Sequence, residues 1–176
     1  AGNPRNTVAV EKAVAEIPKA KVQVVFLGAT TAAGIEFVKQ YAAAGGAGSM
    51  LYGMSIIDTD ALLKALGPQR ARGYAFSVVL AQQGDRAVVR EYLQLRQASK
   101  DPDLSARSME GFIAAKALVK VMEGAATLNA AGVSAALASA KAVDVGGYTL
   151  DFSARGQTAS RFVDFAMFGA GGKLVQ

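Results

Sequence analysis

The sequence contains no cysteine, no histidine and no tryptophan. Without cysteine there is no thiol nucleophile and no disulfide. Without histidine there is no Ser-His-Asp triad, no haem-ligating imidazole and no ordinary zinc site. The absence of free thiols suits an oxidising compartment but does not assign one. These absences exclude several large classes of enzymes and metalloproteins, and we expect neither a metal nor a cofactor.

Long apolar runs and segregated charge are absent as well. No stretch of about 18 apolar residues occurs, which argues against a membrane-spanning helix. The 176 residues are 52% apolar, enough for one domain or two small lobes. The net charge is +5, but the basic residues are scattered among acids, whereas a nucleic-acid-binding face concentrates them between stacking aromatics. We therefore expect a solvated basic surface and no nucleic-acid partner.

The first 79 residues alternate between helix and strand patterns. Short connections between them predict right-handed crossovers and hence an α/β fold with a parallel sheet flanked by helices. The expected elements are a helix beginning at Asn6 or Thr7 and ended by Pro18, a strand at 22–27, a helix ended by Gly45, a strand at 49–53, a helix at 60–66 capped by Asp58 or Thr59 and closed by Gly67, and a strand at 73–79.

The pattern changes after Asp85. Helices are expected at 86–98, 105–124 and 133–139, and they are followed by strand-like segments at 148–152 and 161–168. A polar loop joins these two segments, which predicts an antiparallel hairpin near the carboxy terminus. The phenylalanines of this region are expected in the core; they are Phe152, Phe162, Phe165 and Phe168.

The turn from Gly28 to Gly34 lies between a strand and a helix, where a phosphate-binding loop would lie. Such a loop needs Lys and then Ser or Thr after its second glycine, whereas Ile35 and Glu36 follow here, and no G-x-G-x-x-G fingerprint is present. An ordinary turn and a site for a non-phosphate ligand remain open. Free N–H groups at a helix start, with the hydroxyls of Thr30 and Thr31, would suit a polar or anionic group.

Carboxylate pairs occur twice, at Asp58 with Asp60 and at Asp101 with Asp103. Both pairs lie beside expected helix starts, where acids cap the helix and complement its dipole. Catalytic pairs require burial and separated pKa values, so capping is the better interpretation. No catalytic constellation is assembled.

Several segments form a recognisable set in this order and spacing. They include Val22-Gln-Val-Val-Phe-Leu27 with Gly28-Ala29, Tyr74-Ala-Phe-Ser-Val-Val79, Glu110-Gly-Phe-Ile-Ala-Ala-Lys-Ala-Leu118 and Leu150-Asp-Phe-Ser153. The set resembles the carboxy-terminal half of a type I periplasmic binding protein of the leucine/isoleucine/valine-binding family, which serves branched-chain amino-acid ABC transporters. The resemblance covers essentially the whole chain but only half of such a protein.

The resemblance implies a Rossmann-like sheet within a two-lobed fold that ends in a β-hairpin. Residues 1–75 would belong to the second lobe, residues 76–142 would be a helical return into the first lobe, and residues 143–176 would be the closing hairpin of the second lobe. The missing amino-terminal half would be a partner. A chain that carries helices without most of the strands of a lobe would expose apolar faces.

Carried over by position, the resemblance places the solute against Gly28, Ala29 and Thr30, with Ser55 from the next strand. Ser55 stands where amino-acid binders place an acid that pairs with the ligand's ammonium group. Arg107, or its neighbour Ser108, would lie near the cleft, and an arginine there would favour an anion. The implied solute is a small amino-acid-like molecule or another small carboxylate, and the serine at position 55 favours a carboxylate that is not a simple α-amino acid.

The resemblance implies a non-catalytic, periplasmic solute receptor that closes on its solute by hinge motion and presents it to a membrane ABC permease. Two alternatives remain open. One is a ligand-sensing regulatory domain of the same fold, because fold does not separate transport from sensing. The other is a Rossmann-like enzyme that uses a nucleotide, which would need a phosphate loop that the sequence lacks.

Overall fold

The computed structural model describes residues 2, 4, 7–81, 84–154 and 158–176. The chain forms two compact units. Unit 1 comprises Ala1–Val79 and Val163–Gln176, and unit 2 comprises Leu80–Phe162. Each unit has its own cluster of buried apolar side chains. The chain passes from one unit to the other twice.

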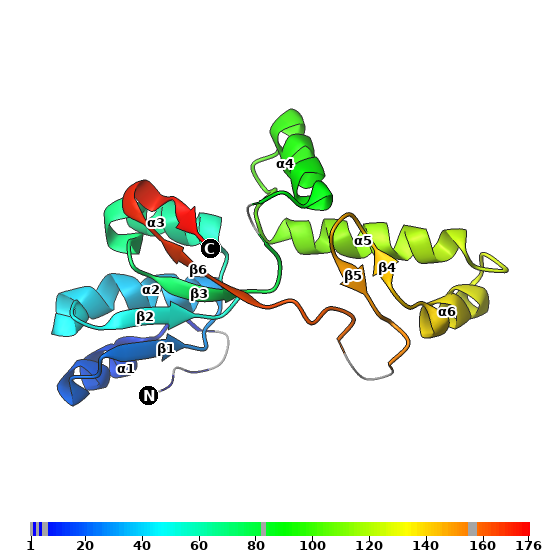
Figure 1. The fold of residues 1–176 in the computed structure, drawn as a ribbon. Coiled ribbons are helices and arrows are strands. Elements are labelled where there is room, and N and C mark those ends of the chain that lie inside the picture. The colour runs from blue at the N-terminus through cyan, green and yellow to red at the C-terminus, as the bar shows by residue number, and fades with distance from the viewer. Residues whose placement is uncertain (1, 3, 5–6, 82–83, 155–157) are drawn as a thin grey trace. The chain divides into compact units, whose positions relative to one another are not determined.

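Unit 1 is built on a five-stranded sheet with the strand order β1-β2-β3-β6-β7 (Figure 1). The first three strands are parallel, and the last two run antiparallel to their neighbours. The parallel sheet expected from the alternating pattern is therefore confirmed for β1 to β3. The strands are β1 (Val24–Leu27), β2 (Met50–Gly53), β3 (Ala75–Val78), β6 (Asp164–Phe168) and β7 (Leu174–Val175).

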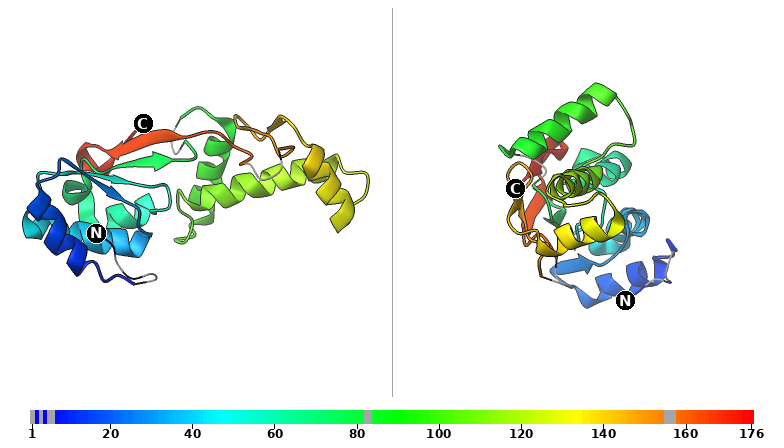
Figure 2. Two further views of the ribbon diagram at one scale, coloured as in Figure 1. Left: turned by 90° about the horizontal axis from the view of Figure 1, so that it is seen from below. Right: turned by 90° about the vertical axis from the view of Figure 1, so that its right-hand side faces the viewer.

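Three α-helices form a single layer on one face of this sheet (Figure 2, left). They are α1 (Glu11–Glu16), α2 (Thr31–Tyr41) and α3 (Thr59–Ala71), accompanied by the short turns η1 (Ile17–Ala20), η2 (Ala42–Gly46) and η3 (Ala170–Gly172). The Asp58 carboxylate accepts a hydrogen bond from the Ala61 N–H at 2.9 Å, which confirms the predicted cap of α3. Gly67 takes a positive φ of 73° inside α3, so the predicted end of the helix is a kink after which the helix continues.

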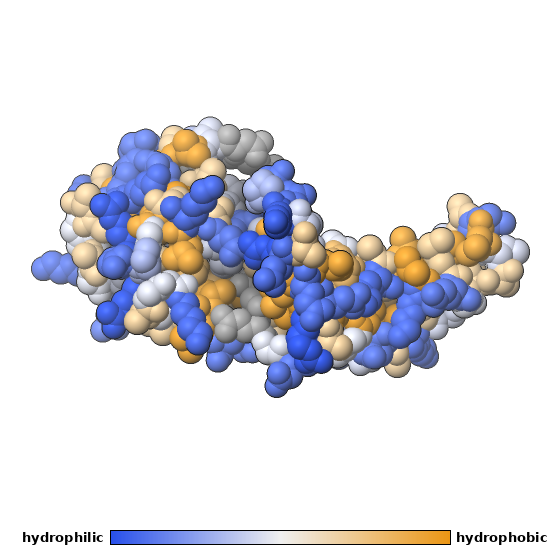
Figure 3. Space-filling model, turned by 90° about the horizontal axis from the view of Figure 1, so that it is seen from above, coloured by the Kyte–Doolittle hydropathy of each residue, from blue (hydrophilic) through white to orange (hydrophobic). Residues whose placement is uncertain are grey.

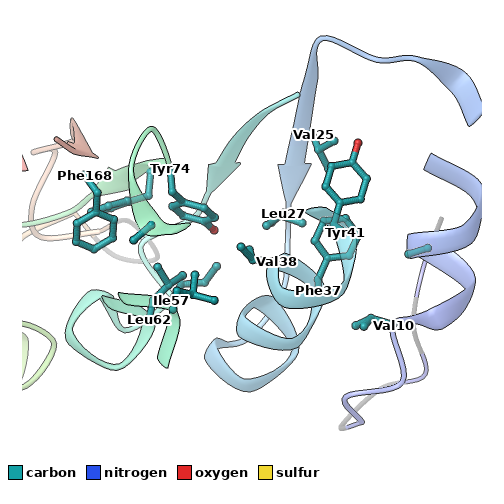
Figure 4. Close-up of a cluster of buried hydrophobic side chains, with 14 of the residues drawn as sticks. Val10, Val25, Leu27, Phe37, Val38, Tyr41, Ile57, Leu62, Tyr74 and Phe168 are labelled. Atoms are coloured by element: carbon teal, nitrogen blue, oxygen red, sulfur yellow. The ribbon is translucent and has the colours of Figure 1, made fainter. Parts of the chain in front are cut away.

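The core of unit 1 lies between the sheet and this helix layer. Alternate residues of a strand face opposite sides, so β1 buries Val25 and Leu27 and leaves Val24 and Phe26 exposed. Phe168 is buried as expected, but Phe165 is exposed because it lies on the face of the sheet that no helix of the described residues covers. The principal side chains of this cluster are Val10, Val14, Val25, Leu27, Phe37, Val38, Tyr41, Ile57, Leu62, Leu66, Tyr74, Phe76, Val78 and Phe168 (Figure 4).

Unit 2 is mainly helical. It contains α4 (Ala87–Ser99), α5 (Ser108–Glu123) and α6 (Ala130–Ser139), with a two-stranded antiparallel sheet of β4 (Val143–Asp144) and β5 (Thr149–Leu150). The helices expected in this region are confirmed. Arg86 lies over the Tyr148 ring, 4.4 Å from its centroid, and donates a hydrogen bond to the Gly147 carbonyl. The main buried residues are Val88, Val89, Tyr92, Met109, Ile113, Ala117, Val145 and Tyr148.

The carboxy-terminal hairpin differs from the one expected. The segment 148–152 does not pair with 161–168: β5 pairs with β4, whereas β6 pairs with β3 and β7. A tight turn at Gly146 and Gly147, both at positive φ, joins β4 to β5. Strand β5 therefore pairs with β4, the strand just before it in the sequence. The closing hairpin is thus β6 with β7. Residues 143–162 consequently lie in unit 2, whereas the sequence grouped them with the closing hairpin.

Tyr74 places a hydroxyl inside the apolar core of unit 1. Its side chain points among Leu27 and Val38 (Figure 4), and the hydroxyl has no hydrogen-bond partner among the described residues. Burial raises the pKa of the Tyr74 phenol, which therefore stays neutral. Gly53 makes room for this hydroxyl, since a Cβ at that position would overlap it. Burying this hydroxyl without a hydrogen-bond partner lowers the stability of the fold.

We predict that Tyr74→Phe raises the free energy of unfolding by about 1 kcal/mol, because it removes a buried hydroxyl that bonds to nothing. Tyr41→Phe is the matched control: its hydroxyl is hydrogen-bonded to the Ser49 hydroxyl at 3.0 Å, and its loss should lower stability by about the same amount. Urea unfolding followed by circular dichroism measures both. A loss of stability in Tyr74→Phe would show that the hydroxyl has a partner.

The Asp144 carboxylate holds the turn between β4 and β5. It accepts hydrogen bonds from the N–H groups of Gly147 at 3.0 Å and Gly146 at 3.2 Å, and these bonds lower the Asp144 pKa. Because the folded-state pKa is the lower one, the stabilisation is complete above the ordinary value of 3.8 and is lost as pH falls through the folded value. Asp144→Asn should be less stable than the wild type at neutral pH, and this deficit should shrink in acid. Unfolding curves across that range measure it, and a deficit that does not change with pH would contradict the assignment.

Candidate functional site

The loops after β1, β2 and β3 lie at the carboxyl edge of the parallel strands of unit 1. The last residue of β1, Leu27, pairs with the last residue of β2, Gly53, so residues 28–30 and Ser55 follow at the same edge. In open α/β sheets this edge is where ligands bind. The structure therefore brings together the four unit 1 residues that the sequence singled out.

Thr31 fastens the first of these loops to the second. Its hydroxyl accepts a hydrogen bond from the Asp58 N–H at 2.9 Å and donates one to the Ile56 carbonyl at 3.5 Å. The start of α2 is thereby joined to the segment that leads into α3. The sequence analysis considered this hydroxyl as a group that could bind a solute, but in the structure it is used to hold the two segments together.

Ser77 fastens the second loop to the third strand. Its hydroxyl accepts a hydrogen bond from the Ser55 N–H at 3.2 Å. The sequence analysis did not single out Ser77, although a hydroxyl inside the otherwise apolar strand Tyr74-Ala-Phe-Ser-Val-Val79 is a signal that could have been used. Ser55 is half-buried, and its backbone position is set by this bond.

Thr30 differs from Thr31 in having a hydroxyl that the helix does not use. It occupies the N-cap position of α2 in an extended conformation, and its side chain makes no capping hydrogen bond. Gly28 is exposed, and an added Cβ there would meet no atom within 4 Å. The first N–H groups of an 11-residue helix and a spare hydroxyl thus border open space, an arrangement suited to a carboxylate or another polar group.

Arg107 belongs to unit 2, where it is the exposed N-cap residue of α5. The loop before it is well fixed: the Tyr92 hydroxyl donates to the Ser105 carbonyl at 2.6 Å, and the Ser108 hydroxyl accepts from the Ser105 N–H at 2.8 Å. Ser108 is therefore occupied in holding the start of α5. Arg107 and the unit 1 residues lie in separate units and are not brought together within either.

Groups that could hold a metal are not found in the described part of the chain, where no three acidic side chains gather. None of the helices described is both long and apolar enough to cross a membrane. A cavity of about 500 Å³ in unit 1 is lined by residues such as Lys39, Tyr41 and Arg70, and by none of the residues at the carboxyl edge. The candidate site is therefore an open edge that contacts a solute through backbone N–H groups and hydroxyls.

Unit 1 is therefore an α/β unit with a helix-covered, largely parallel sheet, the architecture in which ligands bind at the carboxyl edge. Residues 3–173 match the family model described as periplasmic binding protein, and the chain belongs to that family. The resemblance found in the sequence is thereby confirmed. No curated protein sequence matches the chain.

The solved structures agree with this family. A substrate-binding periplasmic protein from Ralstonia solanacearum is 38% identical, with a TM-score of 0.89 over 99% of this chain and 51% of that one. An ABC-transporter solute-binding protein from R. palustris in complex with benzoate is 23% identical (TM-score 0.75, 98% and 47% covered). A branched-chain amino-acid ABC transporter protein from Thermus thermophilus with bound valine is 13% identical (TM-score 0.71, 97% and 48%). The last two show the fold alone, and this chain spans about half the length of each.

We predict that Thr31→Val lowers the free energy of unfolding by about 1 kcal/mol, because the Asp58 N–H loses its acceptor. Thr30→Val is the matched control one residue earlier, and it should change stability by less than about 0.5 kcal/mol, since its hydroxyl bonds to nothing in the helix. Chemical denaturation of the two variants side by side provides the measurement. Equal losses would mean that the Thr31 hydroxyl does not join the two loops.

Proposed function

We propose that this chain is part of the extracytoplasmic solute-binding component of an ABC transporter, a receptor without catalytic activity. The observation that carries the proposal is the open carboxyl edge of unit 1, where the N–H groups at the start of α2, the Thr30 hydroxyl and Ser55 lie together in a chain of this family. Solute-binding relatives of the same fold support it. The alternative of a nucleotide-using enzyme lacks a phosphate loop.

The solute is held, in this proposal, by Gly28, Ala29, Thr30 and Ser55 from unit 1 and by Arg107 from unit 2. Backbone N–H groups and hydroxyls are donors that stay neutral, so they bind a carboxylate without a change of protonation. Arg107 contributes a guanidinium that can hold a carboxylate with two hydrogen bonds. Hinge closure is the motion that the proposal assigns to the receptor as it encloses its solute.

The solute class follows from the absence of a carboxylate side chain at Ser55. A serine offers a hydroxyl, and an α-ammonium group held by it lacks the charge-assisted partner that a carboxylate would provide, a difference of about 1.5–3 kcal/mol. A small carboxylate without an α-ammonium group meets no such deficit. Benzoate, which the R. palustris relative binds, belongs to this class, whereas valine, which the Thermus relative binds, does not.

The setting of this receptor is the periplasm, and its partners are the small acid, a membrane ABC permease and the polypeptide that supplies the other wall of the cleft. Family membership supports the location and the transport role. A sensing role would use the same cleft. A permease gene beside this one would favour transport, and a fused output domain would favour sensing.

We predict that the full-length gene product binds benzoate more tightly than L-valine and that the double variant Thr30→Ala/Ser55→Ala weakens the benzoate affinity about tenfold or more, through the loss of two hydrogen bonds. Titration calorimetry measures both affinities. Native mass spectrometry of the purified protein gives the mass of any acid that co-purifies.

Ser134→Ala, an exposed position on α6, is the control and should leave the affinity unchanged. An unchanged affinity in the double variant would remove both residues from the site. Tighter binding of valine would contradict the solute class, and the absence of any bound acid would contradict the receptor role.

A further inference from the structure

Four connections of unit 1 meet at the amino edge of its sheet, the end of the parallel strands opposite the candidate solute site. Three of them lead into β1, β2 and β3, and the fourth is the turn that joins β6 to β7. The Gly73 N–H donates a hydrogen bond to the Phe168 carbonyl at 2.8 Å, which places the end of β6 beside the start of β3. The four connections are residues 17–23, 42–49, 72–74 and 169–173.

The amino edge carries positive charge and no acidic residue in any of its four connections. Hydrophilic and apolar residues are interspersed over the face of the molecule seen in Figure 3, so hydrophilic character alone does not distinguish this edge. The sign of its charges does, because residues that are scattered along the sequence are gathered here by the fold. The cations of the edge, including those in the last turns of α2 and α3, are Lys19, Lys21, Lys39, Arg70, Arg72 and Lys173.

The cavity of about 500 Å³ in unit 1 lies at this amino edge. Its charged lining residues are Lys39, Arg70 and Arg72, and no acidic residue of the described chain lines it. Within the described residues, none of these three side chains makes an ion pair or a hydrogen bond. The cavity therefore presents three cations whose charge is not balanced by a neighbouring carboxylate.

The wall of the cavity is fixed by a short chain of hydrogen bonds. The Ser49 hydroxyl donates to the Val22 carbonyl at 2.7 Å and lies 3.0 Å from the Tyr41 hydroxyl, which donates to it. Gly46 lets the Tyr41 ring lie against the chain, because a Cβ at that position would come within 2.2 Å of the ring. A wall that is already ordered adds little entropic cost to binding.

The helix dipoles account for only part of this charge. Lys39 and Arg70 lie in the last turns of α2 and α3, where a cation complements the partial negative charge of the helix end. Arg72 follows α3, and its backbone N–H already donates to the Pro68 carbonyl at 3.1 Å. Its guanidinium is therefore in excess of what the helix ends need, and so is the exclusion of acids from all four connections.

We propose that this cavity is a second binding site, which takes a ligand with a phosphate monoester group. A phosphate monoester carries close to two negative charges at neutral pH, and the planar guanidinium groups of Arg70 and Arg72 match its oxygens with paired hydrogen bonds. Lys39 adds a third positive charge. A single carboxylate would leave most of this charge unmatched. The volume is that of a small-molecule site.

The phosphate group comes either from a soluble ester or from the headgroup of an anionic lipid, and both sources present the same chemistry to the cavity. The site is separate from the proposed solute site, since the four-residue strands β1 and β2, about 13 Å long, lie between the two edges of the sheet. The proposal is independent of the solute-binding function.

The test compares two pairs of substitutions that remove the same charge from the full-length gene product. Arg70→Gln/Arg72→Gln removes two cations from the cavity, and Lys12→Gln/Lys64→Gln removes two exposed cations from α1 and α3 that do not line it. Titration calorimetry with phenyl phosphate measures binding of a soluble ester. Co-sedimentation with phosphatidylcholine vesicles, with and without phosphatidic acid, measures binding of a lipid headgroup. Circular dichroism checks that each variant is folded.

We expect the wild type to bind phenyl phosphate with a Kd below about 1 mM, the arginine pair to bind it at least about tenfold more weakly, and the lysine pair to differ by less than about twofold. Sedimentation with phosphatidic acid vesicles that the arginine pair loses and the lysine pair keeps would also support the site and would identify a lipid headgroup as the source. Binding of phenyl phosphate without vesicle binding would identify a soluble ester.

The proposal is overturned if the wild type binds neither probe, or if the arginine and lysine pairs lose equal affinity, since net charge alone would then explain the binding. It is also overturned if Thr30→Ala/Ser55→Ala abolishes phenyl phosphate binding while the arginine pair retains it, because the ligand would then lie at the carboxyl edge. The benzoate affinity should be the same in the arginine pair and the wild type. Failure of the phosphate site and failure of the proposed receptor function are therefore distinguishable.

Discussion

The right-handed crossover between parallel strands is the constraint on which unit 1 depends. Because β1, β2 and β3 follow one another across the sheet, their connecting helices all lie on one face, and the loops that leave the strands all emerge at one edge. The same constraint thus produces the helix-covered core, the polar edge and the bare apolar face. The polar edge and the exposed apolar face of the sheet are two consequences of one topology.

The hydroxyl groups at the carboxyl edge fall into two kinds, those bonded to a neighbouring segment and one that its helix does not use. Thr31 joins the start of α2 to the segment after β2, and Ser77 joins that segment to strand β3; each hydroxyl accepts a hydrogen bond from one backbone N–H of that segment. Thr30, one residue before Thr31, is left with a hydroxyl that the helix does not use. A site built in this way is pre-organised, because the groups that fix the loops differ from the groups that would meet the solute. In the proposed site, substitutions of the Thr30 and Ser55 side chains would therefore alter solute binding without removing the hydrogen bonds that fix the edge.

Much of this architecture could be predicted from the sequence. Alternating apolar patterns located β1, β2 and β3 to within a few residues. Asp58, an N-cap residue whose hydrogen bond is local, predicted the start of α3. The pairing of β5 could not be predicted, since residues 148–152 and 161–168 are both strand-like and alternation does not identify a partner. The glycine turn after Asp144 decides it, with a carboxylate that accepts from both following N–H groups.

The resemblance of the sequence to a known family indicated the class of protein. Periodicity and caps, which act over a few residues, determined the order of the helices and strands and the edge where Gly28, Ala29, Thr30 and Ser55 lie. Only the tertiary structure decided which hydroxyls are occupied and which apolar residues remain exposed. Phe165 and Phe168 are equally apolar and three positions apart, yet one is exposed and the other is buried. The reason is physical: their burial depends on which face of the sheet the helices cover, and that is set by connections between strands distant in the chain.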